Sequence, residues 1–385
     1  MLERIAMLSS RAFFLCTICL QAAVLAAQTP PPKAAPPKPD TLVLNDDERL
    51  IGHLVRSNGS SVVFKSDLLG EITVDWSKIK ELHTSGRYAV VPKNVKLTRH
   101  GELGAIPRGS LNEAGQTITV GQPDGAPAKS IPVADTAQVL PESVFDKDVV
   151  HGPGLLQAWT GAVTAGATVV QATQESRAFT GAFNLVRAVP TETWLGPGNR
   201  TLVDFSASEG FVSQPNTPKV KTEIVHAHAE RDQYFSGSRV YGFGQAIFDH
   251  NFSQGLDLQQ NFGGGIGYTA IKQSDLTLDL KGSANFVRQT FAIPGVDHNL
   301  AGSTFAESLW RKFPRGMTVV QLFTVTPAWN ELHAWMATAS ASLTVPVYDR
   351  LSFSIGLMEN FLNDPAPGFK KNSFQGITGL TYSFK

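Results

Sequence analysis

From residue 157 to residue 385 the sequence is a series of long runs in which apolar and polar residues alternate. A period of two places the apolar set on one face of a β-strand and the polar set on the other. Strands of soluble proteins usually have about five or six residues, whereas tilted membrane-spanning strands need about 9 to 11. The runs are of the longer kind, so they predict an antiparallel transmembrane β-barrel. We count twelve runs, with approximate spans 157–171, 176–189, 199–213, 219–232, 237–251, 258–271, 275–290, 299–313, 316–329, 332–347, 350–362 and 373–385.

The alternation is clearest in Leu276–Phe286, where Leu278 and Leu280 share one face and Asp279 and Lys281 share the other. An even number of strands suits a closed bacterial barrel whose two ends both lie on the periplasmic side. Closure leaves no unpaired strand edge, which lipid would not tolerate. A soluble sandwich shows the same alternation, so a secreted β-sandwich binding protein is one alternative.

Aromatic residues are concentrated near the ends of these runs, which is where membrane barrels carry their interfacial girdles. Five of the six Trp fall in this region: Trp159, Trp194, Trp310, Trp329 and Trp335.

The last run ends on Gly379–Phe384, with apolar residues at alternate positions and an aromatic at its close. This segment resembles the C-terminal signal that the barrel assembly machinery reads in bacterial outer-membrane proteins. Lys385 departs from that pattern, because most such chains end on the aromatic itself. We therefore expect outer-membrane lipid and the assembly machinery as partners.

The N-terminus is typical of a secretory signal. Arg4 and Arg11 precede the apolar stretch Ala12–Leu25, and small residues follow it, which predicts a cleaved signal peptide over residues 1–27. A transmembrane anchor is the alternative. Cys16 and Cys19 both lie in this segment, so disulfides and thiolate metal sites are excluded from the mature chain. Residues 28–39 are Pro-rich and predict a semi-rigid linker.

Residues 40–141 carry shorter alternating runs separated by Gly, Asn and Asp turns, which predicts a small β-rich domain. Its second part repeats the order of the first, so we interpret it as two small units, each resembling an Sm-like small barrel. The breakers Gly152, Pro153 and Gly154 lie in a second linker, 142–156, before the barrel of 157–385. An even-stranded barrel would place this domain in the periplasm, where it could contact a periplasmic partner.

Charge and charged motifs narrow the function. The chain has 33 Lys+Arg and 33 Asp+Glu, and no basic surplus indicates nucleic acid. His226, His228 and Glu230 alternate, so one strand face presents all three while Val225 and Ala227 face lipid. Such a trio could bind zinc. We favour a polar cluster lining the lumen instead, with these further members: Arg239, Asp249, Lys281, Glu307 and Arg311.

We expect no catalytic residue, metal or cofactor. The enzyme alternative, an outer-membrane hydrolase of lipid or peptide, needs a positioned serine and histidine near the rim. The only His-x-Ser spacing is His83-Thr84-Ser85, in the wrong domain. The glycine run Gly263–Gly267 resembles a phosphate-binding loop, but a strand is expected on both sides of it rather than a helix after it.

Several features between Tyr234 and Phe291 resemble an uncharacterised family, a domain of unknown function described as salt-induced outer-membrane proteins. These features are Arg239 with Tyr241, Phe248-Asp249, the glycine run with Tyr268, Leu276-Thr277-Leu278 and, later, Asn363-Asp364-Pro365. The resemblance covers residues 156–385 and implies a barrel in the bacterial outer membrane. For its role we expect a structural, envelope-stress or narrow-pore function.

Overall fold

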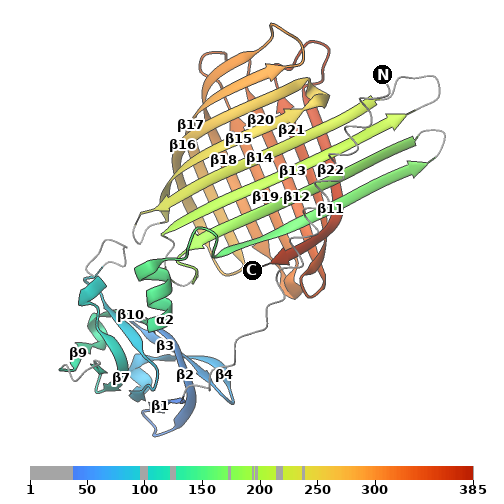
Figure 1. Ribbon diagram of the computed structural model, residues 1–385. Coiled ribbons are helices and arrows are strands. Elements are labelled where there is room, and N and C mark those ends of the chain that lie inside the picture. The colour runs from blue at the N-terminus through green and yellow to red at the C-terminus, as the bar shows by residue number, and fades with distance from the viewer. Residues whose placement is uncertain are drawn as a thin grey trace. The chain divides into compact units, whose positions relative to one another are not determined.

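The computed structural model describes residues 38–95, 103–121, 127–171, 175–192, 195, 198–213, 220–235 and 239–384. The predicted signal peptide, most of the Pro-rich linker, Trp194 and Lys385 lie outside these residues. Figure 1 shows two parts that are both built from strands, a large barrel and a smaller sheet. No helix among the described residues is long and apolar enough to cross a membrane.

The large barrel closes in sequence order from β11 to β22, and β11 pairs antiparallel with β22. This confirms the prediction of twelve antiparallel strands. Their bounds are β11 Trp159–Gln171, β12 Glu175–Val189, β13 Asn199–Ser213, β14 Val220–Tyr234, β15 Val240–Asn251, β16 Leu256–Lys272, β17 Leu276–Phe291, β18 His298–Lys312, β19 Thr318–Thr326, β20 Met336–Tyr348, β21 Leu351–Leu362 and β22 Asn372–Phe384. Two 3-10 turns join them, η6 Phe252–Gln254 and η7 Pro314–Gly316.

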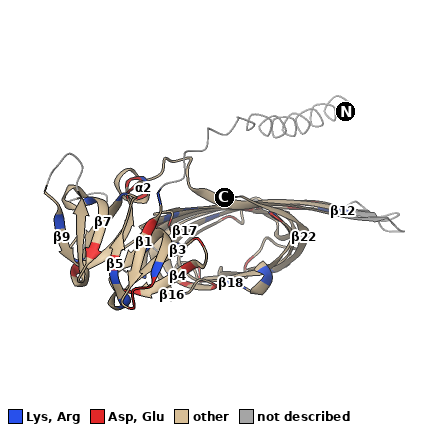
Figure 2. Cartoon of the chain, turned by 90° about the horizontal axis from the view of Figure 1, so that it is seen from below, with Lys and Arg blue, Asp and Glu red and all other residues tan. Residues whose placement is uncertain are grey.

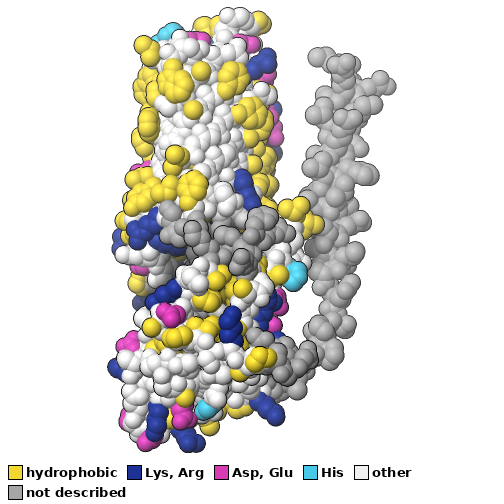
Figure 3. All heavy atoms as spheres, turned by 90° about the vertical axis from the view of Figure 1, so that its left-hand side faces the viewer, with side chains coloured by type: hydrophobic (Ala, Val, Ile, Leu, Met, Phe, Trp, Pro, Cys, Tyr) yellow, Lys and Arg dark blue, Asp and Glu magenta, His cyan; other side chains and the backbone are white. Residues whose placement is uncertain are grey.

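The two faces of the barrel wall differ sharply in polarity. On β17, Leu280 is 43% exposed and Phe286 is 51% exposed, whereas Asp279 and Asn285 on the opposite face are only 4% and 6% exposed. Hydrophobic side chains are spread over the outer wall of the barrel in Figure 3. In Figure 2 its strands are mostly free of charged positions along their length. At β17 the wall is therefore apolar outside and polar inside, the arrangement that a membrane requires.

The smaller sheet contains ten strands, and six of them form a closed ring. The ring runs β1-β5-β7-β6-β10-β2, and pairing of β1 with β2 closes it. The strands are β1 Asp40–Leu44, β2 Arg49–Asn58, β3 Ser61–Ser66, β4 Gly70–Asp75, β5 Ile79–His83, β6 Tyr88–Pro92, β7 Arg108–Ala114, β8 Thr117–Gly121, β9 Lys129–Pro132 and β10 Thr136–Pro141. The remaining four strands extend β2 through β3–β4 and β7 through β8–β9. We call the ring and its extensions the small barrel.

The small barrel is built from two copies of one motif. In each copy, four strands and a 3-10 turn precede a fifth strand, with η1 (Trp76–Lys78) before β5 and η4 (Val133–Asp135) before β10. The prediction of a small barrel is confirmed, but the interpretation that each copy forms its own barrel is wrong. Each copy supplies three strands to one shared ring. A unit of that size cannot bury enough apolar surface alone, so the copies must combine.

The interior of the small barrel is apolar. Leu42, Val62, Phe64 and Val90 are fully buried. Buried Asp40 accepts hydrogen bonds from the Leu54 amide (2.9 Å) and the Tyr88 hydroxyl (3.0 Å), which joins β1 to β2 and β6.

The segment after β10 is helical at its start, with α2 (Glu142–Phe145) followed by the π-helical η5 (Asp146–His151). Phe145 and Val149 of this segment pack with Ala89, Val91 and Leu140. A further short turn, η2, spans Leu103–Ala105.

Candidate functional site in the barrel lumen

The first cluster of the lumen lies on β13, β14 and β15. The strand register places Asp204 opposite His228 and His226 opposite Asp249, so all four side chains point inward. His226 contacts Asp249 through Nδ1 (2.6 Å to Oδ1), and its Nε2 lies 3.4 Å from Asp204. His228 contacts the other oxygen of Asp204 at 2.6 Å. Two imidazoles and two carboxylates thus alternate in one row.

The row continues toward both ends of the barrel. His228 Nε2 lies 3.8 Å from Glu230, and Glu230 pairs with Lys281 of β17, three strands away in the ring. At the other end the Gln259 amide donates to Asp249 at 2.8 Å. Because β14 and β17 are three strands apart in the ring, the contact between Glu230 and Lys281 crosses part of the lumen.

A second cluster lies where β13 begins and β14 ends. Arg200 donates to Asp232 through Nε (2.7 Å) and to Asp279 through Nη2 (3.1 Å). Thr269 donates to the other oxygen of Asp279 at 2.6 Å. One guanidinium is therefore held between two buried carboxylates, which is the pairing that a buried charge needs.

Two polar atoms of this second cluster lack an ordinary hydrogen-bond donor. Asp232 and Tyr241 are fully buried, yet no N–H or hydroxyl group of a described residue donates to Asp232 Oδ1 or to the Tyr241 hydroxyl. The Asp232 carboxyl interacts with the Glu230 carboxyl. The Arg200 guanidinium lies 5.6 Å from the centre of the Tyr241 ring. Gly267 makes room for this ring, since a Cβ there would lie 2.2 Å from it. Buried polar atoms without partners usually contact water or an ion.

The structure brings together five of the side chains that the sequence singled out. They are His226, His228, Glu230, Asp249 and Lys281. Sequence reasoning missed four others in the same two clusters: Arg200, Asp204, Asp232 and Asp279. Each lies on a polar face at period two, but only the register between strands shows which polar faces meet.

Arg239 does not join the clusters. It is exposed just before β15 begins and donates to the Ala270 carbonyl at 3.1 Å.

The expectation that Glu307 and Arg311 line the lumen is wrong, because both lie on the outer face of β18. Glu307 pairs with Leu280 across β17 and β18, so it shares the outer face with that leucine. Arg311, four residues further along β18, faces the same side as Glu307. Its guanidinium carbon lies 4.8 Å from the centre of the Phe313 ring. The polar pattern of β18 does not alternate strictly, so polarity alone gave the wrong face.

The zinc interpretation receives no geometric support among the described residues. No group of three His, Cys, Asp or Glu side chains there is arranged to hold a metal ion. Both imidazoles are instead engaged with carboxylates. The glycine run lies inside β16, which continues as a strand on both sides of it.

The two clusters lie on the wall formed by β13 to β17, which we call the charged wall. The wall formed by β20, β21, β22 and β11 differs from it, and we call it the hydroxyl wall. Its inward positions are mostly hydroxyl-bearing or small. Ser354 contacts Thr381 (2.7 Å) and Thr344 (3.2 Å), and Thr381 contacts Thr164 (2.7 Å). Ser340 and Ser342 continue this wall and are half-buried, as are Asp204 and Asp249 on the charged wall. Hydroxyl oxygens therefore line this side of the lumen.

Side chains bridge one mouth of the barrel. We call it the distal mouth, the end at which β15–β16, β17–β18, β19–β20 and β21–β22 connect. Gln254 of η6 is 1% exposed and donates to the carbonyls of Asn360 (3.1 Å) and Lys371 (2.7 Å). Ser253 contacts Ser373 at 3.0 Å. Since β16 and β22 are six strands apart in a ring of twelve, these contacts join opposite walls.

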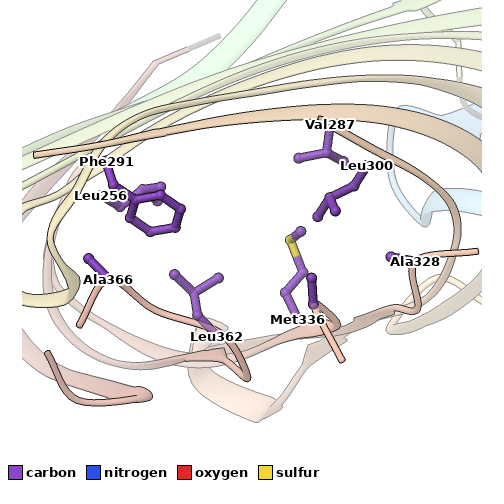
Figure 4. Close-up of a cluster of buried hydrophobic side chains, with 9 residues drawn as sticks. Leu256, Val287, Phe291, Leu300, Ala328, Met336, Leu362 and Ala366 are labelled. Atoms are coloured by element: carbon purple, nitrogen blue, oxygen red, sulfur yellow. The ribbon is translucent and has the colours of Figure 1, made fainter. Parts of the chain in front are cut away.

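An apolar cluster lies beside this bridge, and Figure 4 shows its side chains converging from several strands. We call it the distal plug. Its buried members are Leu256, Val287, Phe291, Leu300, Ala328, Ala334, Met336, Leu362 and Ala366. Phe369 packs against it, and a Cβ on Gly255 would lie 2.7 Å from that ring. The distal mouth is narrowed by both polar and apolar contacts.

These features define the class of protein. A closed twelve-stranded antiparallel barrel with ionisable side chains inside and apolar side chains outside is the fold of outer-membrane β-barrels. The chain belongs to the family described as "Protein of unknown function, DUF481", whose family model matches residues 163–384. The resemblance predicted from the sequence, to an uncharacterised family, is thereby confirmed.

Solved structures similar to the chain include two bacterial barrels. The translocator domain of the autotransporter NalP from Neisseria meningitidis has 13% identity and a TM-score of 0.32, covering 63% of this chain and 93% of its own. The COG4313 outer membrane channel from Pseudomonas putida F1 has 9% identity and a TM-score of 0.35, covering 59% of this chain and 95% of its own. No curated protein matches the chain.

Proposed function

We propose that this chain is an integral barrel of the bacterial outer membrane that gives small polar solutes or ions a narrow, restricted passage. The observation that carries the proposal is the polarity of the wall. Phe305 is 62% exposed on the outer face, while Asp232 is fully buried in the lumen. Water would favour the reverse arrangement, but a bilayer outside and a polar lumen inside favour this one.

Aromatic side chains at both ends of the strands support the membrane setting. Trp329 lies between β19 and β20 and is 60% exposed, whereas Tyr348 lies at the opposite end of β20 and is 79% exposed. Rings of this kind settle at the two lipid–water interfaces. Their separation along one strand matches a barrel that crosses the bilayer.

The bridged distal mouth supports a narrow passage over a wide pore. Gln254 and the distal plug join opposite walls, so a large solute could not pass there without their displacement. The role we favour is therefore a narrow pore, ahead of a purely structural or envelope-stress role.

We propose no catalysis. Among the described residues, neither His226 nor His228 hydrogen bonds with a serine hydroxyl, and both bond to carboxylates. The small barrel would lie in the periplasm, because the chain enters β11 and leaves β22 at the same end of an even-stranded barrel.

Cell fractionation of the full chain tests the location. We expect recovery in the outer membrane, with gel mobility that shifts on heating. Recovery in the soluble periplasm would favour a secreted β-sandwich instead.

Planar-bilayer recording of the refolded chain tests the passage. We expect small, stepwise conductance that rises in the Gln254→Ala variant, because the bridge is lost. Gln375→Ala, on an inward position of β22, is the matched control and should leave conductance near the parent value. A folded barrel that stays silent in both forms would rule out a passage.

A further inference from the structure

The two walls of the lumen carry unequal charge. The charged wall, β13 to β17, presents five carboxylates and two permanent cations inside the rim. The carboxylates are Asp204, Glu230, Asp232, Asp249 and Asp279, and the cations are Arg200 and Lys281. Carboxylates therefore outnumber the permanent cations on this wall.

The two cations have little charge left to attract an anion. Arg200 lies between Asp232 and Asp279, and Lys281 pairs with Glu230. Lys272 and Lys312 have inward parity but end their strands at the rim, where they are exposed. Water screens charges at such positions, whereas charges within the lumen are screened less.

A second observation points to a bound cation or its water. Asp232 is fully buried, and no N–H or hydroxyl group of a described residue donates to its Oδ1, although its carboxyl group interacts with that of Glu230. The Tyr241 hydroxyl beside it is also buried and unpartnered. A buried oxygen in such a place is stabilised by a donor, by water or by a cation.

The hydroxyl wall suits the same kind of solute. Ser340, Ser342, Ser354 and Thr381 all lie at inward positions, so their hydroxyl groups line this side of the lumen. Among described side chains at inward positions on β18–β22, β11 and β12, no Lys or Arg lies inside the rim. Hydroxyl oxygens can coordinate small hard cations, and no cationic side chain on this wall attracts an anion.

We infer that the lumen passes monovalent inorganic cations in preference to anions. This inference rests on the proposed passage and names its substrate class. A cation moving along the hydroxyl wall has carboxylates opposite it and hydroxyl oxygens beside it. The same carboxylates repel an anion, and Arg200 and Lys281 are already paired with carboxylates.

Reversal-potential measurements on the full chain in a KCl gradient test the inference. K⁺ permeability should exceed Cl⁻ permeability several-fold. Asp249→Asn and Asp204→Asn should each lower that ratio. Glu307→Gln is the matched control, because it also removes a carboxylate from the barrel but from the outer face, and it should leave the ratio unchanged.

Each outcome has a distinct meaning. A conducting barrel with equal or greater Cl⁻ permeability overturns the cation preference and leaves the passage standing. An equal loss of selectivity in Glu307→Gln overturns the role of the lumen charges. A heat-modifiable barrel that never conducts overturns the passage and the preference together. Heat-shifted gel mobility of every variant separates these results from misfolding.

Discussion

The small barrel and the large barrel are both closed rings of alternating strands, yet they bury opposite faces. In the small barrel Phe64 and Val90 point inward and are fully buried. In the large barrel Asp232 is fully buried inside, while Phe305 is 62% exposed outside. Both rings have the same period of two, so this pattern predicts a strand in each case. Whether the apolar face points inward or outward depends on the surrounding solvent.

Ring size explains how each interior is filled. Six strands enclose a space that apolar side chains fill from both copies of the motif. Twelve strands enclose more, so the large barrel spans its lumen with paired charges and with the distal plug. We therefore expect the apolar face to be the sensitive one in both rings, which is the inner face of the small barrel and the lipid-facing outer face of the large barrel.

The largest effect is expected from Phe64→Ala in the small barrel. Residues 38–151 expressed alone should melt cooperatively with strand-type circular dichroism. Phe64→Ala should lower the free energy of unfolding by about 3–5 kcal/mol, because it leaves a cavity in a fully buried core.

Phe305→Ala is the counterpart in the large barrel. Lipid can fill the space left on the outer face, so urea unfolding of the barrel in vesicles should show a smaller loss. Equal losses at Phe64 and Phe305 would contradict the opposite facing of the two rings.

The next effect concerns arginine on the wall of the large barrel. Leu280→Arg should cost about 2–4 kcal/mol near the middle of the bilayer, because the charge would face lipid. Ser340→Arg places the same charge on an inward position and should cost less. Equilibrium unfolding in vesicles measures both, and equal tolerance would mean that the facing is misassigned.

The smallest effect concerns an unpaired acid in the small barrel. Glu113 is fully buried, and its Oε2 has no partner from any described residue. Burial raises the pKa of the Glu113 carboxyl from its ordinary 4.5 to about 6. The folded state therefore binds this proton more tightly than the unfolded state. The stability that the group contributes is present below pH 4.5 and is lost as the pH rises through 6.

Glu113→Gln should accordingly stabilise residues 38–151 by about 1–2 kcal/mol at pH 7. The gain should shrink as the pH falls toward 4.5, since the parent carboxyl then becomes neutral too. Chemical denaturation across that range checks the trend. A gain that stays constant with pH would point to packing as its cause.

The sequence was sufficient to predict the strands of the large barrel but not which side chains meet inside it. Strand length and period depend on local residues, so β13 was predicted over the residues it occupies, Asn199–Ser213. The pairing of Asp204 with His228 depends on register, which no single strand contains. The same limit explains Glu307, whose outward face follows from pairing with Leu280.

The repeat in the small barrel was visible for the same local reason. Its two copies show similar turns and runs, so the order of elements could be predicted. Pairing of β5 with β7, by contrast, joins the two copies, and long-range pairing of this kind leaves no local pattern.

A single-cysteine scan along β17 tests the inverted polarity most directly. Positions Thr277–Phe286 would each be labelled with a polarity-sensitive fluorophore in the full chain refolded into vesicles. We predict a period of two, with an apolar environment at Leu278, Leu280 and Phe286 and a polar one at Thr277 and Asp279. Uniform environments, or the reverse alternation, would contradict a barrel that faces lipid outside and water inside.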